Sequence, residues 1–143
     1  MDYLKVLVEE IHSVVVATVD ETGHPHTAVM DMMWEDGKTV YFLTADFKPL
    51  YKRLKEDGRV ALTGMTQGAG TMDRKSISLT GQVEWIGKEH LEELLEANPY
   101  MYEIYPTEEG RSHLQVFRFK KALGDFYDLT QLPPYQVRFE IEE

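Results

Sequence analysis

Residues 39–64, TVYFLTADFKPLYKRLKEDGRVALTG, decide the fold class because they predict a strand, a short helix and a second strand in succession. The first six residues are β-branched or aromatic, a composition typical of strands. Apolar residues then recur at helical spacing over residues 47–56. Gly58 ends this helix, and a second strand follows from residue 60.

The predicted helix and its flanks are locally cationic in an acidic chain. The formal net charge of the chain is -10, yet bases outnumber acids between residues 46 and 59: Lys48, Lys52, Arg53, Lys55 and Arg59 against Asp46, Glu56 and Asp57. Unpaired N–H groups at a helix N-terminus and the helix dipole both favour an anion. The stretch therefore predicts an anion site, of the kind that holds a phosphate, where the strand meets the helix.

The composition indicates a single globular domain, residues 1–143. Hydrophobic residues make up 43% of the chain, and the absence of cysteine excludes disulfides, thiolate metal sites and a cysteine nucleophile. The excess of 25 acidic over 15 basic residues argues against binding to nucleic acid. Apolar runs near the start are too short for a membrane span or a signal peptide, so we expect a soluble, cytoplasmic protein.

The rest of the chain predicts mainly β structure with a few helices inserted. Three strands joined by short turns, at 13–20, 26–34 and 39–44, predict an antiparallel meander, because parallel neighbours need long crossovers. The further predicted elements are a helix at 3–11, strands at 59–66 and 76–86, a polar loop at 67–75, helices at 88–97 and 98–112, a hairpin at 114–119 and 124–129, and an extended tail from 133.

Few side chains indicate chemistry of their own. The sequence contains no nucleophile elbow, zinc-protease motif or phosphate-binding glycine loop, so no catalytic residue is predicted. His24 and His26 alternate at a strand start, which is more typical of a solvated edge than of a metal site. Asp31 lies among apolar neighbours and needs a partner if it is buried. Lys75, Arg74 and a cofactor N–H are the alternatives.

Five segments together match a known pattern: PHTAVMDMM at 25–33, VYFLTADFKPLYKRLKEDGRVALTG at 40–64, KSISLTGQV at 75–83, NPYMYEIYPTEEGR at 98–111 and GDFYDL at 124–129. In these segments the chain resembles the flavin-binding split-barrel family typified by pyridoxamine 5'-phosphate oxidase, and its small nitroimidazole-resistance-like members. The resemblance implies a six-stranded antiparallel Greek-key split barrel, mainly β with flanking helices. It also implies a homodimer with FMN at the subunit interface.

The resemblance further implies which residues bind the cofactor. Its flavin-contacting positions are Val29, Met30, Asp31, Met32, Met33, Leu43 and Thr44, its phosphate-binding positions lie near Lys48 and Lys52, and its pyrimidine-edge positions are Lys75 and Ser76. Two positions depart from the family, because Ala28 stands where the family has an arginine and Leu50 where it has a lysine. Lys48, with Lys52 one turn later, would compensate for the lost charge.

The resulting hypothesis is an FMN-dependent oxidoreductase that acts on a small molecule through the flavin N5, with NADH or NADPH as candidate electron donors. A flavin carrier or sensor without turnover is the first alternative. The second alternative is a split barrel that binds haem, with His26 as the candidate ligand, or another flavin-like cofactor, and the third is a purely structural dimer. Oxidation of pyridoxamine phosphate is not expected, because the acidic tail from Pro133 would repel a phosphorylated substrate.

Overall fold

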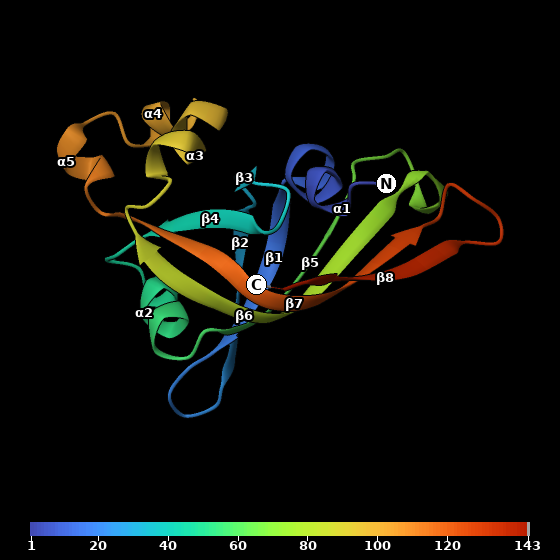
Figure 1. Cartoon of the computed structure of the whole chain (residues 1–143), viewed down its shortest axis with the longest axis horizontal. Helices are drawn as coiled ribbons and strands as arrows, with labels where there is room; N and C mark the ends of the chain where they lie inside the picture. The colour runs from blue at the N-terminus through green and yellow to red at the C-terminus, as the bar shows by residue number, and fades with distance from the viewer. Residues whose placement is uncertain (143) are drawn as a thin grey trace.

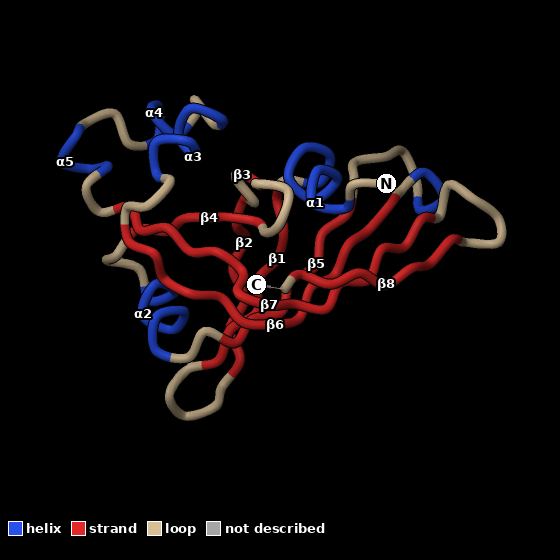
Figure 2. Tube along the Cα trace, in the orientation of Figure 1, coloured by secondary structure: helices blue, strands red, loops and turns tan. Residues whose placement is uncertain are grey.

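The β-branched and aromatic segments form one curled antiparallel sheet in the computed structural model, which describes residues 1–142 (Figures 1 and 2). The order of the strands is β2-β1-β5-β6-β7-β4-β3, and β8 pairs with β7. The strands are β1 Ser13–Val19, β2 Pro25–Asp31, β3 Trp34–Glu35, β4 Val40–Ala45, β5 Arg59–Met65, β6 Lys75–Gly87, β7 Leu114–Asp128 and β8 Tyr135–Ile141. The predicted split-barrel class is confirmed, although the described residues form eight strands rather than six.

The helices lie at the edges of this sheet and are short. They are α1 Tyr3–Lys5, which continues as the π-helix η1 Val6–Ile11, then α2 Pro49–Glu56, the 3₁₀ turn η2 Thr71–Asp73, α3 Leu91–Ala97, α4 Met101–Ile104 and α5 Glu108–Arg111. Lys48 is extended and Pro49 occupies the first turn of α2, where its fixed φ suits a helix. Gly58 has a φ of +78° and releases the chain into β5. In Figure 1, α2 and the α3–α5 group flank the same end of the sheet.

Two hydrophobic cores fill the molecule. The main core lies against η1, β1, β5, β6 and β7, and the second core lies between α3, α4 and the paired strands β4 and β7. Leu7 and Phe126 are fully buried in the main core, and Leu94 and Val116 are fully buried in the second. Burial of such side chains contributes about 1.5–3 kcal/mol each to folding. The two cores share β7, so this strand ties the helical end to the sheet.

The predicted meander of three strands is wrong at its second pairing. β1 pairs with β2 and β3 pairs with β4, but β4 takes β7 as its other partner instead of β2. The chain leaves β2 at Met32 and Met33, which are both buried, Met32 in the main core and Met33 in the second. Adjacent residues of an extended chain point to opposite faces, so the chain has a core on either side here. Met32 N donates to His12 O and Met33 N donates to Tyr41 O, so the backbone hydrogen bonds pass from the side of β1 to β4 between these two residues, and β2 and β4 share no ladder.

The predicted hairpin over residues 114–129 is also wrong, because β7 is one continuous strand of 15 residues. The apparent turn at Lys120 and Lys121 is instead an irregularity in the pairing with β6. Gly124 does not turn the chain; its missing side chain makes room for the ring of Phe139 on β8, where an added Cβ would lie 2.6 Å from Cε1. The tail that was predicted as extended is thus the edge strand β8.

Gly81 provides a test of this close strand packing. An added Cβ would lie 2.6 Å from Ala122 Cα on β7, and that neighbour is backbone. We expect Gly81→Ala to lower the free energy of unfolding by about 1–3 kcal/mol, since overpacking must push two strands apart. Gly70→Ala is the control, because a Cβ there meets nothing within 4 Å, and it should change stability by less than about 0.5 kcal/mol. Urea denaturation measures the stability of both variants. Equal denaturation midpoints would contradict the pairing register of β6 and β7.

Candidate functional site

A cavity of about 580 Å³ lies where β2 and β4 fail to pair, and we call it the β2–β4 cavity. Its walls come from β2, the end of β4, the start of α2 and α4. Seven of the predicted cofactor-binding residues line it: Val29, Met30, Asp31, Met33, Leu43, Thr44 and Lys48. Residues distant in sequence are therefore brought together along the open seam of the sheet, with apolar side chains in the middle.

One end of the β2–β4 cavity is cationic. Lys48 precedes the first turn of α2, and Arg53 lines the cavity one turn further along the same helix. Arg53 Nε donates a hydrogen bond to Thr18 Oγ1 at 2.8 Å, which fixes the side chain while leaving other guanidinium donors available. The dipole of α2 adds to the positive potential at this end, although Pro49 has no N–H and the N–H of Tyr51 donates to Lys48 O. This end has the donors that a phosphate group requires.

Arg53 was missing from the predicted site, whereas Lys52 was included. Lys52 lines a neighbouring cavity of about 470 Å³ and not the β2–β4 cavity, while Arg53 lines both. Arg53 follows Pro49 by four residues and so shares the face of α2 that carries Pro49. That spacing was the signal in the sequence, but it could not be used without knowing which face of α2 meets β2.

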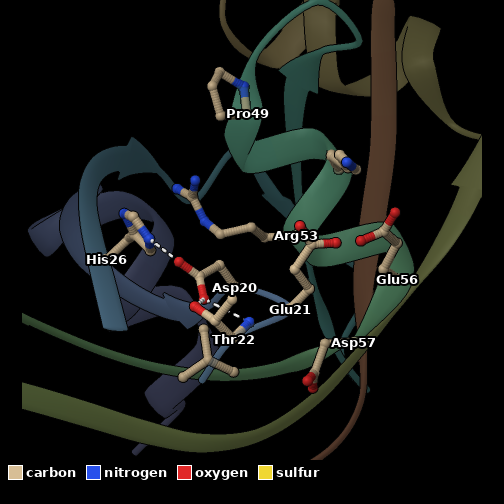
Figure 3. A pocket seen from close by; sticks show the side chains of 10 residues that line it. Asp20, Glu21, Thr22, His26, Pro49, Arg53, Glu56 and Asp57 are labelled. Carbon is tan, nitrogen blue, oxygen red and sulfur yellow. Dashed lines mark hydrogen bonds and ion pairs between the residues drawn. The ribbon is translucent and has the colours of Figure 1, made fainter. Parts of the chain in front are cut away.

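The neighbouring cavity, which we call the Asp20 cavity, is lined by four carboxylates, those of Asp20, Glu21, Glu56 and Asp57 (Figure 3). Asp20 accepts hydrogen bonds from His26 Nε2 at 2.8 Å and from the hydroxyl and backbone N–H of Thr22. The hydrogen bond from His26, followed by that from Thr22, holds the pKa of Asp20 well below its ordinary value. Arg53 extends from α2 toward this pair in Figure 3. Within residues 1–142, no three His, Asp or Glu side chains gather to hold a metal ion.

Asp31 is partnered by hydroxyl groups, and the two expected basic partners are wrong. Its Oδ1 accepts from Ser13 Oγ at 2.6 Å, and its Oδ2 accepts from Tyr100 Oη at 2.7 Å. Lys75 Nζ instead lies 3.8 Å from Glu10 Oε1. His12 Nε2 lies 2.7 Å from the same tyrosine hydroxyl. Nothing in the spacing of these residues could have indicated the cluster, because three separate segments contribute to it.

His12 and Asp31 share the single hydroxyl proton of Tyr100. His12 Nδ1 lies 3.0 Å from the carbonyl oxygen of Val8, which only accepts, so Nδ1 carries a hydrogen. Tyr100 has one hydroxyl proton and two acceptor neighbours at 2.7 Å, His12 Nε2 and Asp31 Oδ2. With neutral His12 the hydroxyl proton serves only one of the two contacts at a time, and His12 Nε2 also lies 3.5 Å from Asp31 Oδ2. The three side chains therefore form one compact polar cluster, of which Asp31 lines the β2–β4 cavity.

The remaining predicted residues lie elsewhere. Lys75 and Ser76 line a third cavity of about 590 Å³, which we call the Arg74 cavity. It adjoins the β2–β4 cavity because Val29, which is 73% exposed, lines both. Met32 is fully buried in the main core, so its side chain faces away from the surface. The predicted cofactor-binding residues other than Lys52 and Met32 thus line these two cavities, which share Val29.

A split barrel with a cationic cavity at its open seam is the architecture that the sequence resemblance implied. The sequence profile described as pyridoxamine 5'-phosphate oxidase matches residues 2–126. The chain therefore belongs to the pyridoxamine 5'-phosphate oxidase family. A search of curated protein sequences found no match.

Three solved structures illustrate the range of similar folds. A NimC/NimA family protein from Clostridium acetobutylicum has a TM-score of 0.75 at 22% identity, over 93% of this chain and 86% of that one. A haem-binding protein from Mycobacterium smegmatis has a TM-score of 0.72 at 13% identity, over 95% of this chain and 56% of that one. A pyridoxamine 5'-phosphate oxidase-related, FMN-binding protein from Nostoc punctiforme has a TM-score of 0.61 at 11% identity, over 90% and 85%. Among residues 1–142, no helix has the length and apolar character needed to cross a membrane.

Replacement of the shared hydroxyl tests the polar cluster at Asp31. Burial, and then the hydrogen bond to Asp31, raise the pKa of Tyr100 above the ordinary value of 10.0. Tyr100→Phe should lower the free energy of unfolding at neutral pH by about 1–3 kcal/mol, because His12 and Asp31 lose their common partner. Above about pH 10 tyrosine ionises first in the unfolded chain, so the stabilisation by Tyr100 is lost and the difference should shrink.

Urea denaturation at the two pH values measures this difference, with Tyr102→Phe as the control. Tyr102 is 43% exposed, and a phenylalanine there retains the ring beneath the Arg111 guanidinium. The control should match the parent protein at both pH values. Equal stability of Tyr100→Phe and the parent at neutral pH would contradict the cluster.

Proposed function

We propose that the protein is a homodimeric FMN-binding flavoprotein that oxidises or reduces a small molecule. The single observation that carries this proposal is the groove of the β2–β4 cavity, which is cationic at one end and apolar in the middle. Such a groove suits a ligand with one phosphate and a flat, largely apolar ring system. The Arg74 cavity, which Lys75 and Ser76 line, adjoins this groove at Val29 and stays free of FMN in our proposal.

The residues present fit the phosphate of FMN even though two family cations are absent. Ala28 lines the cavity with only a methyl group, and Arg53 reaches the same cavity from α2. Leu50 belongs to the main core and is buried there, so a charge at this position would lack water. In our proposal Lys48, Arg53 and Thr44 hold the phosphate, and the charge of the missing arginine is supplied from the helix instead of from β2.

The middle of the groove fits the flavin ring. Val29, Met30, Met33 and Leu43 supply apolar surface, and methionine sulfur packs well against aromatic rings. Bound FMN would supply hydride or electron transfer at its N5. The protein's own contribution would be to orient the ring and to limit access of water. NADH or NADPH remains the candidate electron donor, and a cytoplasmic location belongs to the same proposal.

A second copy of the chain would cover the exposed apolar side chains beside the groove. Val15, Val29 and Met65 stand on three neighbouring strands, β1, β2 and β5, and are 43%, 73% and 53% exposed. Apolar side chains that gather in this way on a sheet are typical of an interaction surface. The same three side chains line the Arg74 cavity, so we propose that the homodimer interface passes along the rim of that cavity, next to FMN. Val29→Lys should give a monomer by light scattering, whereas Leu132→Lys, at another exposed apolar residue, should leave the dimer intact.

Haem is the alternative ligand that a specific observation favours, since one similar structure is a haem-binding protein. The haem hypothesis assigned His26 as the iron ligand. His26 Nε2 lies 2.8 Å from Asp20 Oδ2, in the Asp20 cavity and outside the apolar groove. FMN therefore fits the groove better than haem does. A flavin carrier without turnover shares the same groove and differs only in its failure to react with an electron donor.

Affinity for FMN tests the phosphate end of the groove. We expect the purified protein to take up FMN, with Lys48→Gln and Arg53→Gln each weakening binding by roughly tenfold or more, because each removes a charge-assisted hydrogen bond. Lys52→Gln should have a smaller effect, since Lys52 faces the Asp20 cavity. Lys55→Gln is the matched control, because Lys55 lies on the same helix but over the ring of Trp85. Fluorescence titration with FMN gives all four affinities.

Three outcomes would decide among the alternatives. Equal FMN affinity in Lys48→Gln, Arg53→Gln and the control would contradict the phosphate assignment. Bound flavin that neither NADH nor NADPH reduces, with no substrate oxidised, would favour the carrier. A Soret band after addition of haem, lost in His26→Ala and in the absence of any FMN uptake, would favour the haem-binding alternative.

A further inference from the structure

Arg74 has unusually poor hydrogen-bond partners for a partly buried guanidinium. Its Nε is buried, and it is the only buried side-chain nitrogen or oxygen within residues 1–142 that lacks a partner. Its Nη1 lies 3.1 Å from the sulfur of Met65, a weak acceptor, and its Nη2 lies 3.4 Å from the carbonyl oxygen of Gly68. No carboxylate in the described chain lies within ion-pair distance of Arg74. Nε itself is closed to solvent, so Nη1 and Nη2 are the donors for which a better acceptor is missing.

The surroundings of Arg74 show where that acceptor would lie. Arg74 and Lys75 both line the Arg74 cavity, and no Asp or Glu lines it. Lys75 is only loosely paired, with its Nζ 3.8 Å from Glu10 Oε1. Two cations therefore face a cavity without a carboxylate, in a chain whose net charge is -10. Hydroxyl groups of Thr63, Thr71 and Ser76 stand in the same wall and could donate to an anion as well.

We propose that the Arg74 cavity binds an oxyanion, a carboxylate or phosphate group of a small molecule, through Arg74 and Lys75. A planar guanidinium can donate two parallel hydrogen bonds to such a group. The cavity volume of about 590 Å³ accommodates a small organic molecule. Binding of an anion at this site does not require flavin, but the assignment of that anion as a substrate rests on the proposed function. A molecule anchored there lies beside Val29, where the Arg74 cavity joins the proposed flavin groove.

The substrates of the proposed oxidoreductase would then be small organic anions. The same oxyanion chemistry has a second source, the phosphate of FMN itself if the cofactor bound in the reverse direction. The two sources differ in what happens once FMN is bound. A substrate site stays open to a free anion, whereas a site for the phosphate of FMN is filled.

Inorganic phosphate is the probe, and the Nε–H signal of Arg74 in ¹⁵N-labelled protein is the direct readout. Phosphate should shift this signal in a saturable manner, and equally so with FMN bound. Arg74→Gln has no Nε–H signal at this position, so phosphate binding to that variant is followed by the backbone amide signals of Thr71 and Ser76. The affinity of the variant for phosphate should fall by roughly tenfold or more. Lys75→Gln should weaken binding as well. Arg138→Gln is the control, because Arg138 is 82% exposed and lies 3.3 Å from Asp125, so phosphate affinity should not change.

Each result supports or overturns the inference. Unchanged phosphate affinity in both Arg74→Gln and Lys75→Gln overturns the site. Loss of phosphate binding on saturation with FMN overturns the assignment to a substrate. Dimer dissociation in Arg74→Gln without any change in phosphate affinity would show that the acceptor of Arg74 belongs to a second copy, and also overturns it. Because the phosphate titration on the flavin-free protein needs no FMN, it can succeed even if the proposed flavoprotein function fails.

Discussion

The chain crosses between the two hydrophobic cores at Met32 and Met33, which follow one another in sequence but are buried in different cores. Met32 N donates to His12 O at 2.7 Å beside β1, whereas Met33 N donates to Tyr41 O at 2.9 Å on β4, and only the short β3 continues the pairing with β4. The edge of β2 that does not pair with β1 faces the end of β4 across the β2–β4 cavity. A ligand can be held in this space between the two strands.

The polar cluster at Asp31 connects the two sides of this seam. His12 has a φ of 62° at the end of η1, and Tyr100 lies at the start of α4. Both side chains meet at the carboxylate that ends β2, so the N-terminal helix, the edge strand and the α3–α4 group are joined by hydrogen bonds. A partly buried carboxylate with two hydroxyl donors stabilises the fold. The same carboxylate lines the candidate site.

Most strands and α2 could be predicted from the sequence because composition, periodicity, proline and glycine act locally. The partners of the strands could not be predicted, since the choice of β7 over β2 as the neighbour of β4 depends on which core each methionine enters. The candidate site shows the same division. Its strand residues followed from the resemblance. Only the orientation of α2 shows that Arg53, and not Lys52, lines the β2–β4 cavity. Tyr100 and His12 were beyond reach, because only the folded chain brings them to Asp31.

The position of β7 late in the chain has a consequence for synthesis on the ribosome. β4 receives its second neighbour only when residues 114–118 have been made, and β6 likewise waits for β7. Until then the nascent chain carries apolar strands with open edges, which are prone to associate with other chains. Pairing between segments so far apart is also slow. The nascent chain is therefore prone to aggregate during translation until β7 has been made and pairs with β4 and β6.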